Sequence, residues 1–282
     1  MDDRDAGSMA GVEVQREPLS GATALAVKGV SVRFGGITAL ESVSLDVGKG
    51  EVLGVIGPNG AGKTTLFNCI CGFVRPDAGS ISWRGERLER MRPDRIAHFE
   101  IARTLQGVGL FPGLTVAENV MVGAQRFRRA GLFSALLALP RSERDERALR
   151  ERALAALRAV GCEDVADRDP GALPFATQKR VALARALAAE PALLMLDEPA
   201  GGLDNEELEQ LAALIQTMRG AISVMLVEHH MDFVMSVCDR VAVLDFGRVI
   251  CTGAPDVVRS DPRVLEAYLG DEAAAGASSD DA

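Results

Sequence analysis

A short stretch in the first quarter of the chain has the residue types that bind nucleotide phosphates. It fits the pattern G-x-x-x-x-G-K-[ST]. Its members are Gly57, Pro58, Asn59, Gly60, Ala61, Gly62, Lys63, Thr64 and Thr65. The glycines let backbone N–H groups face phosphate oxygens, Lys63 adds a full positive charge, and the Thr64 hydroxyl can ligate Mg²⁺. This stretch therefore predicts a nucleotide-phosphate site.

A pair of acids, Asp197 and Glu198, directly follows the apolar run 192–196. A run without polar alternation is typical of a buried strand in the middle of a sheet. Beside a phosphate site, an acid at the end of such a strand can hold Mg²⁺, and a neighbouring acid can accept a proton from the attacking water. We expect Asp197 to be the metal ligand and Glu198 the general base.

The elements that must position these groups follow from the hydrophobic pattern. The apolar run 52–56 predicts a strand that ends in the phosphate-binding stretch, and a helical pattern continues from Thr65. Later apolar runs alternate with helical patterns, which implies parallel strands joined by helical crossovers. The remaining strands are expected at 25–34, 43–47, 80–83, 222–227 and 241–245, and a mainly helical region at 116–161.

Composition excludes several classes of protein. The 282 residues suffice for a domain with its own core, and the five cysteines form no C-x-x-C pair, which favours buried thiols in a reducing compartment. The net charge of -9 argues against general nucleic-acid binding. No apolar stretch approaches the roughly 20 residues that span a bilayer. Residues 1–22 are expected to be a disordered extension without a secretory signal, and 271–282 a disordered tail.

The order of the motifs resembles that of the ATP-binding subunits of ATP-binding cassette (ABC) transporters. The resemblance covers about residues 25–270. It rests on the phosphate-binding stretch, Gln106 after 102–105, the acids Asp197 and Glu198, the sequence Gly202-Leu203-Asp204, and His229 after 226–228. The resemblance implies an α/β fold, that of an ABC-type P-loop ATPase. This fold has three parts: a RecA-like mixed-sheet core, an antiparallel β subdomain and a helical subdomain. The ATPase domain would span 23–270, with the helical subdomain at about 113–190.

The same resemblance assigns roles to individual side chains, with ATP and Mg²⁺ as cofactors. Phe34 would stack on adenine, Gln106 would line the Mg²⁺ and sense the transmembrane partner, and His229 would contact the γ-phosphate. The catalytic set implied is Lys63, Gln106, Glu198 and His229. The metal ligands implied are Thr64, Gln106 and Asp197.

One segment departs from the family pattern. Family members pair so that each ATP lies between the phosphate loop of one subunit and a Leu-Ser-Gly-Gly-Gln signature of the other. This chain reads Leu173-Pro174-Phe175-Ala176-Thr177-Gln178 at that place. Pro174 has no hydroxyl and Phe175 leaves little room beside a phosphate, although the Thr177 hydroxyl and a helix expected from Gln178 could still serve. The departure favours a heterodimer with a second, signature-bearing ATPase over a homodimer.

Segments 101–106 and 263–270 are similar to the ATPase subunits of branched-chain amino-acid importers and of lipopolysaccharide exporters. The segment 129–137 contains a Gly-Leu-Phe sequence that is similar to the importers alone. The implied partners are transmembrane permease subunits, a second ATPase and an external binding protein, with this chain on the cytoplasmic face of the membrane and no nucleic acid. A lipopolysaccharide or lipid exporter, a urea or amide importer and a non-transport ABC ATPase remain alternatives.

Overall fold

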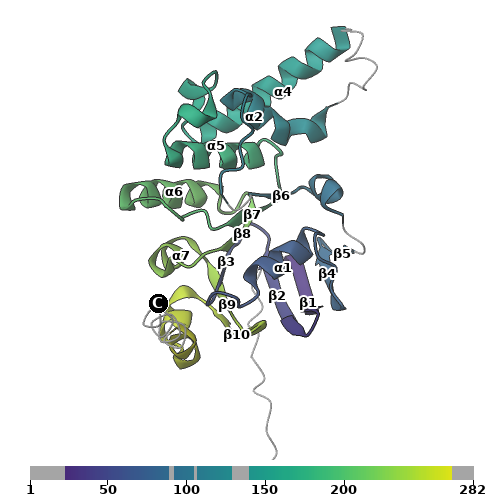
Figure 1. The fold of residues 1–282 in the computed structure, drawn as a ribbon, viewed down its shortest axis with the longest axis vertical. Helices are drawn as coiled ribbons and strands as arrows, with labels where there is room; N and C mark the ends of the chain where they lie inside the picture. The colour runs from purple at the N-terminus through teal and green to yellow at the C-terminus, as the bar shows by residue number, and fades with distance from the viewer. Residues whose placement is uncertain (1–22, 89–91, 105–106, 129–139, 269–282) are drawn as a thin grey trace, which may run out of the picture.

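A six-stranded sheet forms the centre of the molecule (Figure 1), in a computed structural model that describes residues 23–88, 92–104, 107–128 and 140–268. Its strand order is β10-β9-β3-β8-β7-β6, and all strands except β10 run parallel. The strands are β3 (Val52–Ile56), β6 (Ile101–Arg103), β7 (Leu193–Asp197), β8 (Ser223–Val227), β9 (Arg240–Asp245) and β10 (Arg248–Gly253). Every residue of β3, β7 and β8 is buried, which accounts for their unbroken apolar sequences.

A second, antiparallel sheet has the order β2-β1-β4-β5. It consists of β1 (Thr23–Phe34), β2 (Ile37–Gly48), β4 (Ala78–Trp83) and β5 (Glu86–Arg87). Helix α1 (Lys63–Ile70) lies between this sheet and the central one (Figure 1). The helix shares one hydrophobic core with both sheets through Leu66, Phe67 and Ile70. The phosphate-binding stretch is therefore anchored from two sheets.

Three α-helices gather at one end of the central sheet, at the top of Figure 1. They are α2 (Val116–Gly123), α4 (Pro140–Ala159) and α5 (Phe175–Leu187), with short 3₁₀ turns at Ala124–Phe127, Glu163–Val165 and Pro170–Ala172. Thr115 begins α2 with a reciprocal capping box to Glu118, which satisfies two backbone donors at the helix start. Small and aliphatic side chains of these helices form a core that continues onto β7 and β8.

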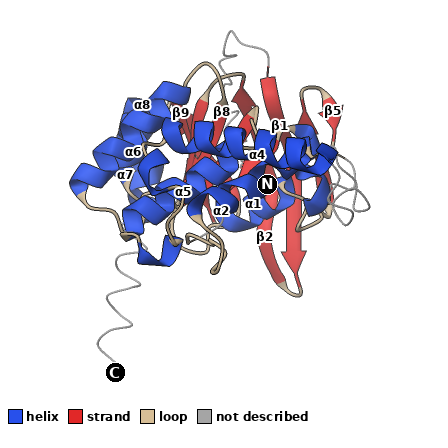
Figure 2. Cartoon of the chain, turned by 90° about the horizontal axis from the view of Figure 1, so that it is seen from above, coloured by secondary structure: helices blue, strands red, loops and turns tan. Residues whose placement is uncertain are grey.

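Three helices cover the face of the central sheet opposite α1: α6 (Asn205–Met218), α7 (Met231–Val237) and α8 (Pro255–Ser260). Figure 2 shows the layers of helices and strands from above. Asp204 caps α6 through a second capping box, with Glu207. Among the described residues, no helix combines the length and apolar character needed to cross a membrane.

The expected α/β class, with a mixed central sheet, an antiparallel sheet and helices, is confirmed. Among the described strands and α-helices, four had no sequence expectation: β5, β6, β10 and α8. The segment Pro93–Phe99 forms a 3₁₀ helix. The helix expected from Gln178 begins at Phe175 instead, because Pro174 can precede a first turn without losing a hydrogen bond that the helix needs.

Several expectations lie on residues that the structure does not describe. All of Gln106, the segment 129–137, the extension 1–22 and the tail 271–282 lies outside the described residues. The boundaries 23–270 for the ATPase domain and about 113–190 for a helical subdomain remain predictions.

Candidate functional site

The phosphate-binding stretch connects β3 to α1 as a tightly packed loop. Gly57 has φ of +149°, and a Cβ atom on it would lie 2.0 Å from the carbonyl oxygen of Leu244. Gly62 has φ of +101°, and its Cβ would lie 2.5 Å from the carbonyl oxygen of Ala39. Only glycine fits either position, because both the backbone conformation and the neighbouring carbonyl exclude a side chain.

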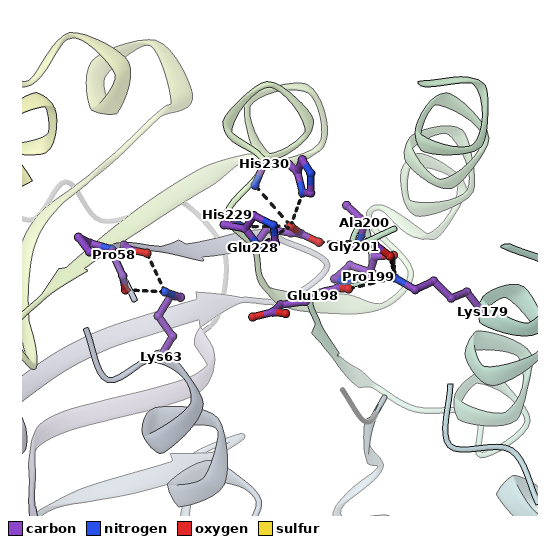
Figure 3. A network of polar contacts seen from close by, with 11 residues as sticks. Pro58, Lys63, Lys179, Glu198, Pro199, Ala200, Gly201, Glu228, His229 and His230 are labelled. Carbon is purple, nitrogen blue, oxygen red and sulfur yellow. Dashed lines mark hydrogen bonds and ion pairs between the residues drawn. The ribbon is translucent and has the colours of Figure 1, made fainter. Parts of the chain in front are cut away.

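Lys63, the first residue of α1, is buried and folds back over this loop. Its Nζ donates hydrogen bonds to the carbonyl oxygens of Gly57 at 2.6 Å and Pro58 at 2.8 Å (Figure 3). The side chain of Thr64 is exposed next to it, at the start of the helix. The loop thus presents an ammonium charge, a hydroxyl and a helix N-terminus together, which is the combination that binds phosphate oxygens.

Asp197 ends β7 and is buried beside α1. Its Oδ2 accepts a hydrogen bond of 2.7 Å from the Arg103 guanidinium, which also donates at 2.7 Å to the Asn68 side-chain oxygen on α1. The Thr104 hydroxyl accepts from the Asp197 backbone N–H at 3.2 Å. These contacts hold the carboxylate at the end of the strand, toward the helix that begins with Lys63 and Thr64.

Glu198 follows Asp197 with an unusual backbone. Its φ of +49° is in the left-handed region, and its N–H donates to the Val227 carbonyl at 3.0 Å. Figure 3 shows the Glu198 carboxyl group on the same side of its turn as Lys63. Left-handed backbone is uncommon for residues other than glycine and concentrates at functional sites. The geometry therefore fits a side chain aimed by its backbone.

Lys179, on α5, approaches the opposite side of this turn. Its Nζ donates to the carbonyl oxygens of Glu198 at 3.3 Å and Pro199 at 2.9 Å, and also to that of Gly201 (Figure 3). Burial lowers the pKa of the Lys179 ammonium, while the charges of Glu228 and Glu198 act to raise it. The nearby carboxylates thus favour the charged form that the hydrogen bonds require.

Glu228 directly follows β8 and is completely buried. Its Oε1 accepts the Ala200 backbone N–H at 2.6 Å, and its Oε2 accepts the His229 N–H at 3.1 Å and the His230 N–H at 3.5 Å. The His230 Nδ1 lies 3.3 Å from the same Oε2. Glu228, His229 and His230 offer ligand atoms within 4.8 Å of one another, as a metal site needs. Since both oxygens of Glu228 already accept backbone donors, we interpret the cluster as a hydrogen-bond junction.

Parallel pairing places the predicted residues along one edge of the sheet. Val227 on β8 is level with Val55 on β3 and with Asp197 on β7. The carboxyl ends of these three neighbouring strands therefore lead at one level into the phosphate loop, into Glu198 and into His229. This edge is the usual ligand position in open parallel sheets. The structure thus brings together the ends that carry Lys63, Asp197, Glu198 and His229.

The other residues singled out from the sequence are Phe34, Gln106, Phe175 and Thr177. Phe34 ends β1 with 51% of its surface exposed, which leaves the ring available for stacking. Gln106 lies outside the described residues. The exposed Phe175 has the Lys179 Nζ 5.3 Å from its ring centre, and its ring also packs against Gly202. The hydroxyl of Thr177, in the first turn of α5, is 3.5 Å from the Arg180 guanidinium.

Sequence reasoning missed three residues of this site: Arg103, Lys179 and Glu228. Arg103 and Lys179 reach the site only through tertiary contacts across the fold, which no local pattern reveals. Glu228 did carry a signal, because it is an acid that directly follows an apolar run and directly precedes His229. The rule that identified Asp197 and Glu198 applies to it as well.

Comparisons with known proteins agree with this geometry. A family model described as ABC transporter matches residues 40–201, and one described as branched-chain amino acid ATP-binding cassette transporter matches 248–274. The chain is 40% identical over 249 residues to the high-affinity branched-chain amino acid transport ATP-binding protein LivG of Salmonella typhimurium, covering 88% of this chain and 98% of LivG.

Two solved structures extend the likeness to the fold. The ADP conformation of MJ1267, an ATP-binding cassette of an ABC transporter, matches with a TM-score of 0.75 and 29% identity, over 88% of this chain and 99% of that one. A dimeric post-hydrolysis state of the cassette MJ0796, bound to ADP and Pi, matches with a TM-score of 0.69 and 26% identity, over 82% and 98%. The chain therefore belongs to the ATP-binding proteins of ABC transporters, in the group that includes LivG.

Proposed function

We propose that this chain is the ATP-hydrolysing subunit of an importer for branched-chain or related amino acids. The observation that carries the catalytic part is the common level of β3, β7 and β8, whose ends lead into the phosphate loop, Glu198 and His229. Lys63 and the loop N–H groups would hold the phosphates, while Phe34 would stack on the adenine. Glu198 would accept a proton from the attacking water, and His229 would contact the γ-phosphate.

The oxygen donors of Thr64 and Asp197 are of the kind that Mg²⁺ prefers, so we assign them as its ligands, with Gln106 as a third. Bound there, Mg²⁺ would neutralise charge on the β- and γ-phosphates. The residues present fit this cation because their oxygen donors lie at the same edge of the sheet. Thr64 lies at the start of α1, after the loop that follows β3, and Asp197 ends β7. The ion pair with Arg103, at 2.7 Å, fixes the orientation of the Asp197 carboxylate.

We propose that the chain works in a heterodimer of ATPases. The bulky Phe175 occupies a sequence position that is a glycine in the Leu-Ser-Gly-Gly-Gln signature, and its ring lies against Gly202 and near the Lys179 ammonium. A partner with a Ser-Gly-Gly signature would complete the site built on Lys63 and Glu198. Permease subunits and an external binding protein would complete the importer, which places this chain at the cytoplasmic face of the membrane, with Gln106 sensing the permease.

The name of LivG and the match at 248–274 support amino-acid import over lipid export. A test is uptake of radiolabelled leucine and urea by cells that lack the gene and carry plasmid-borne variants. Wild type and the surface variant Glu209→Gln should restore leucine uptake, whereas Glu198→Gln should not. Restoration of urea uptake alone would move the substrate to amides, and failure of wild type to restore either would reject the importer assignment.

A further inference from the structure

We propose that Glu228 and Lys179 are positioning residues that hold the turn Glu198–Gly201 from opposite sides, with Glu228 also fixing the loop of His229. The inference deepens the proposed hydrolytic site, because it rests on Glu198 as base and His229 as phosphate contact. Neither positioning residue reaches substrate itself; each acts through a backbone.

The turn needs external support because its first residue is strained. A non-glycine residue in the left-handed region costs about 1–3 kcal/mol and persists only where its surroundings impose it. Glu198 has this backbone, with φ of +49°. If the support were removed, the backbone would relax and carry the Glu198 carboxyl group away from its present direction.

Lys179 supports the carbonyl side of the turn. The ammonium group donates hydrogen bonds to three carbonyl oxygens, those of Glu198, Pro199 and Gly201. Convergence of three carbonyls on one cation fixes the orientation of three peptide planes, because each charge-assisted hydrogen bond is directional. Lys179 belongs to α5, whose first residue is Phe175. Displacement of α5 would therefore be transmitted to the turn that carries Glu198.

Glu228 supports the N–H side of the turn. Its Oε1 accepts the Ala200 N–H, and its Oε2 accepts the N–H groups of His229 and His230. A carboxylate suits this role because both of its oxygens only accept, whereas a glutamine would turn an NH₂ donor toward one of the two loops. Figure 3 shows Glu228 between the histidines and the turn, with Lys179 on the far side. The buried Glu228 side chain is thus hydrogen-bonded both to the turn that carries Glu198 and to the backbone of His229.

The test compares Glu228→Gln, Lys179→Met and Lys179→Arg in the full-length chain, assembled with the subunits that co-purify with it. ATP turnover gives kcat and KM, and a fluorescent ATP analogue gives nucleotide affinity. Glu228→Gln and Lys179→Met should each lower kcat by about 10- to 100-fold, as misplacement of a catalytic group does, with less than about a threefold change in KM. Lys179→Arg should recover part of the loss, because a guanidinium still donates to carbonyls.

The matched control is Glu51→Gln. Glu51 is also a buried carboxylate that accepts a turn N–H, that of Gly48, and pairs with Arg240 away from the site. Its variant should leave kcat unchanged in the folded fraction. The double variant Glu228→Gln with Lys179→Met should lose less than the product of the single losses, because both act on one turn.

Wild-type kcat in both single variants would overturn the proposal, and so would an equal loss in Glu51→Gln or a rise in KM with kcat unchanged. Glu198→Gln separates this result from failure of the proposed function. If Glu198→Gln keeps its turnover, the base assignment fails. If it loses turnover while Glu228→Gln does not, only the positioning role fails.

Discussion

Arg103 and Asp197 form a buried ion pair at the end of β7, with 2.7 Å between the guanidinium and the carboxylate. Their side chains are only 11% and 3% exposed. Arg103 also binds Asn68 on α1, so one guanidinium joins the end of a strand to the helix that follows the phosphate loop. Removing one member of such a pair leaves a buried charge without a partner.

Arg103→Met should therefore lower the free energy of unfolding by about 3–5 kcal/mol in nucleotide-free protein, measured by urea denaturation. Added Mg²⁺ and ATP should recover part of this loss, because a cation beside Asp197 would replace the missing positive charge. The control is Arg84→Met. Arg84 pairs with Glu100 at 2.8 Å, but with side chains 55% and 40% exposed, so its loss should cost less than about 1 kcal/mol. Equal effects of the two variants would contradict the structural role of Arg103.

Gly57→Ala should abolish nucleotide binding and destabilise the fold by more than about 1 kcal/mol, because its Cβ would lie 2.0 Å from the Leu244 carbonyl oxygen. Gly85→Ala is the matched comparison, since Gly85 has φ of +81° but open space around its Cβ position. That variant should bind ATP normally and lose only the cost of the backbone conformation. Isothermal titration with ATP checks both, and normal affinity in Gly57→Ala would refute the packing of the loop.

Glu198→Gln should lower ATP turnover by about 100- to 10,000-fold, the range that a general base contributes, while ATP affinity stays near that of wild type. Phosphate release and nucleotide binding are measured on the same preparation. Unchanged turnover would remove Glu198 from the role of base. Equal losses of turnover and affinity would instead indicate damage to the nucleotide site.

We expect the free energy of unfolding to fall at alkaline pH because the Cys71 thiol is buried. Burial raises the pKa of Cys71 from 9.0 to about 11, against the opposing influence of Arg103. Between pH 9 and 11 the unfolded chain loses this proton while the folded chain keeps it, so the unfolded state binds fewer protons and stability falls as pH rises. The slope from one such thiol is at most about 1.4 kcal/mol per pH unit. Cys71→Ala should show a shallower decline by urea denaturation at pH 8.5 to 10, and an identical slope would contradict the assignment.

The elements that carry their own pattern could be predicted from the sequence. The runs 52–56 and 192–196 are apolar without interruption, and the structure has the fully buried strands β3 and β7 at 52–56 and 193–197. The helical pattern of residues 205–218 also predicts α6, which has these bounds in the structure. The three-residue β6 is too short for a period to appear, and β10 pairs antiparallel at an edge where neighbouring strands supply the order.

Some residues of the site could also be predicted from local sequence, whereas others depend on tertiary packing. Lys63, Asp197 and Glu198 occupy motif positions that follow directly from local chemistry. Lys179 could not be predicted, because its role depends on how α5 packs against the turn after β7. The left-handed backbone of Glu198 also has no sequence signal, since it is imposed by contacts from α5 and β8.

The most direct test of the heteromeric transporter is co-purification of the tagged full-length chain from detergent-solubilised membranes of its own organism, with the bound proteins identified by mass spectrometry. The account predicts a second ATPase that has a Ser-Gly-Gly signature, together with two hydrophobic membrane subunits. Recovery of only this chain with an exporter-type membrane pair, or of soluble nucleic-acid proteins alone, would contradict it.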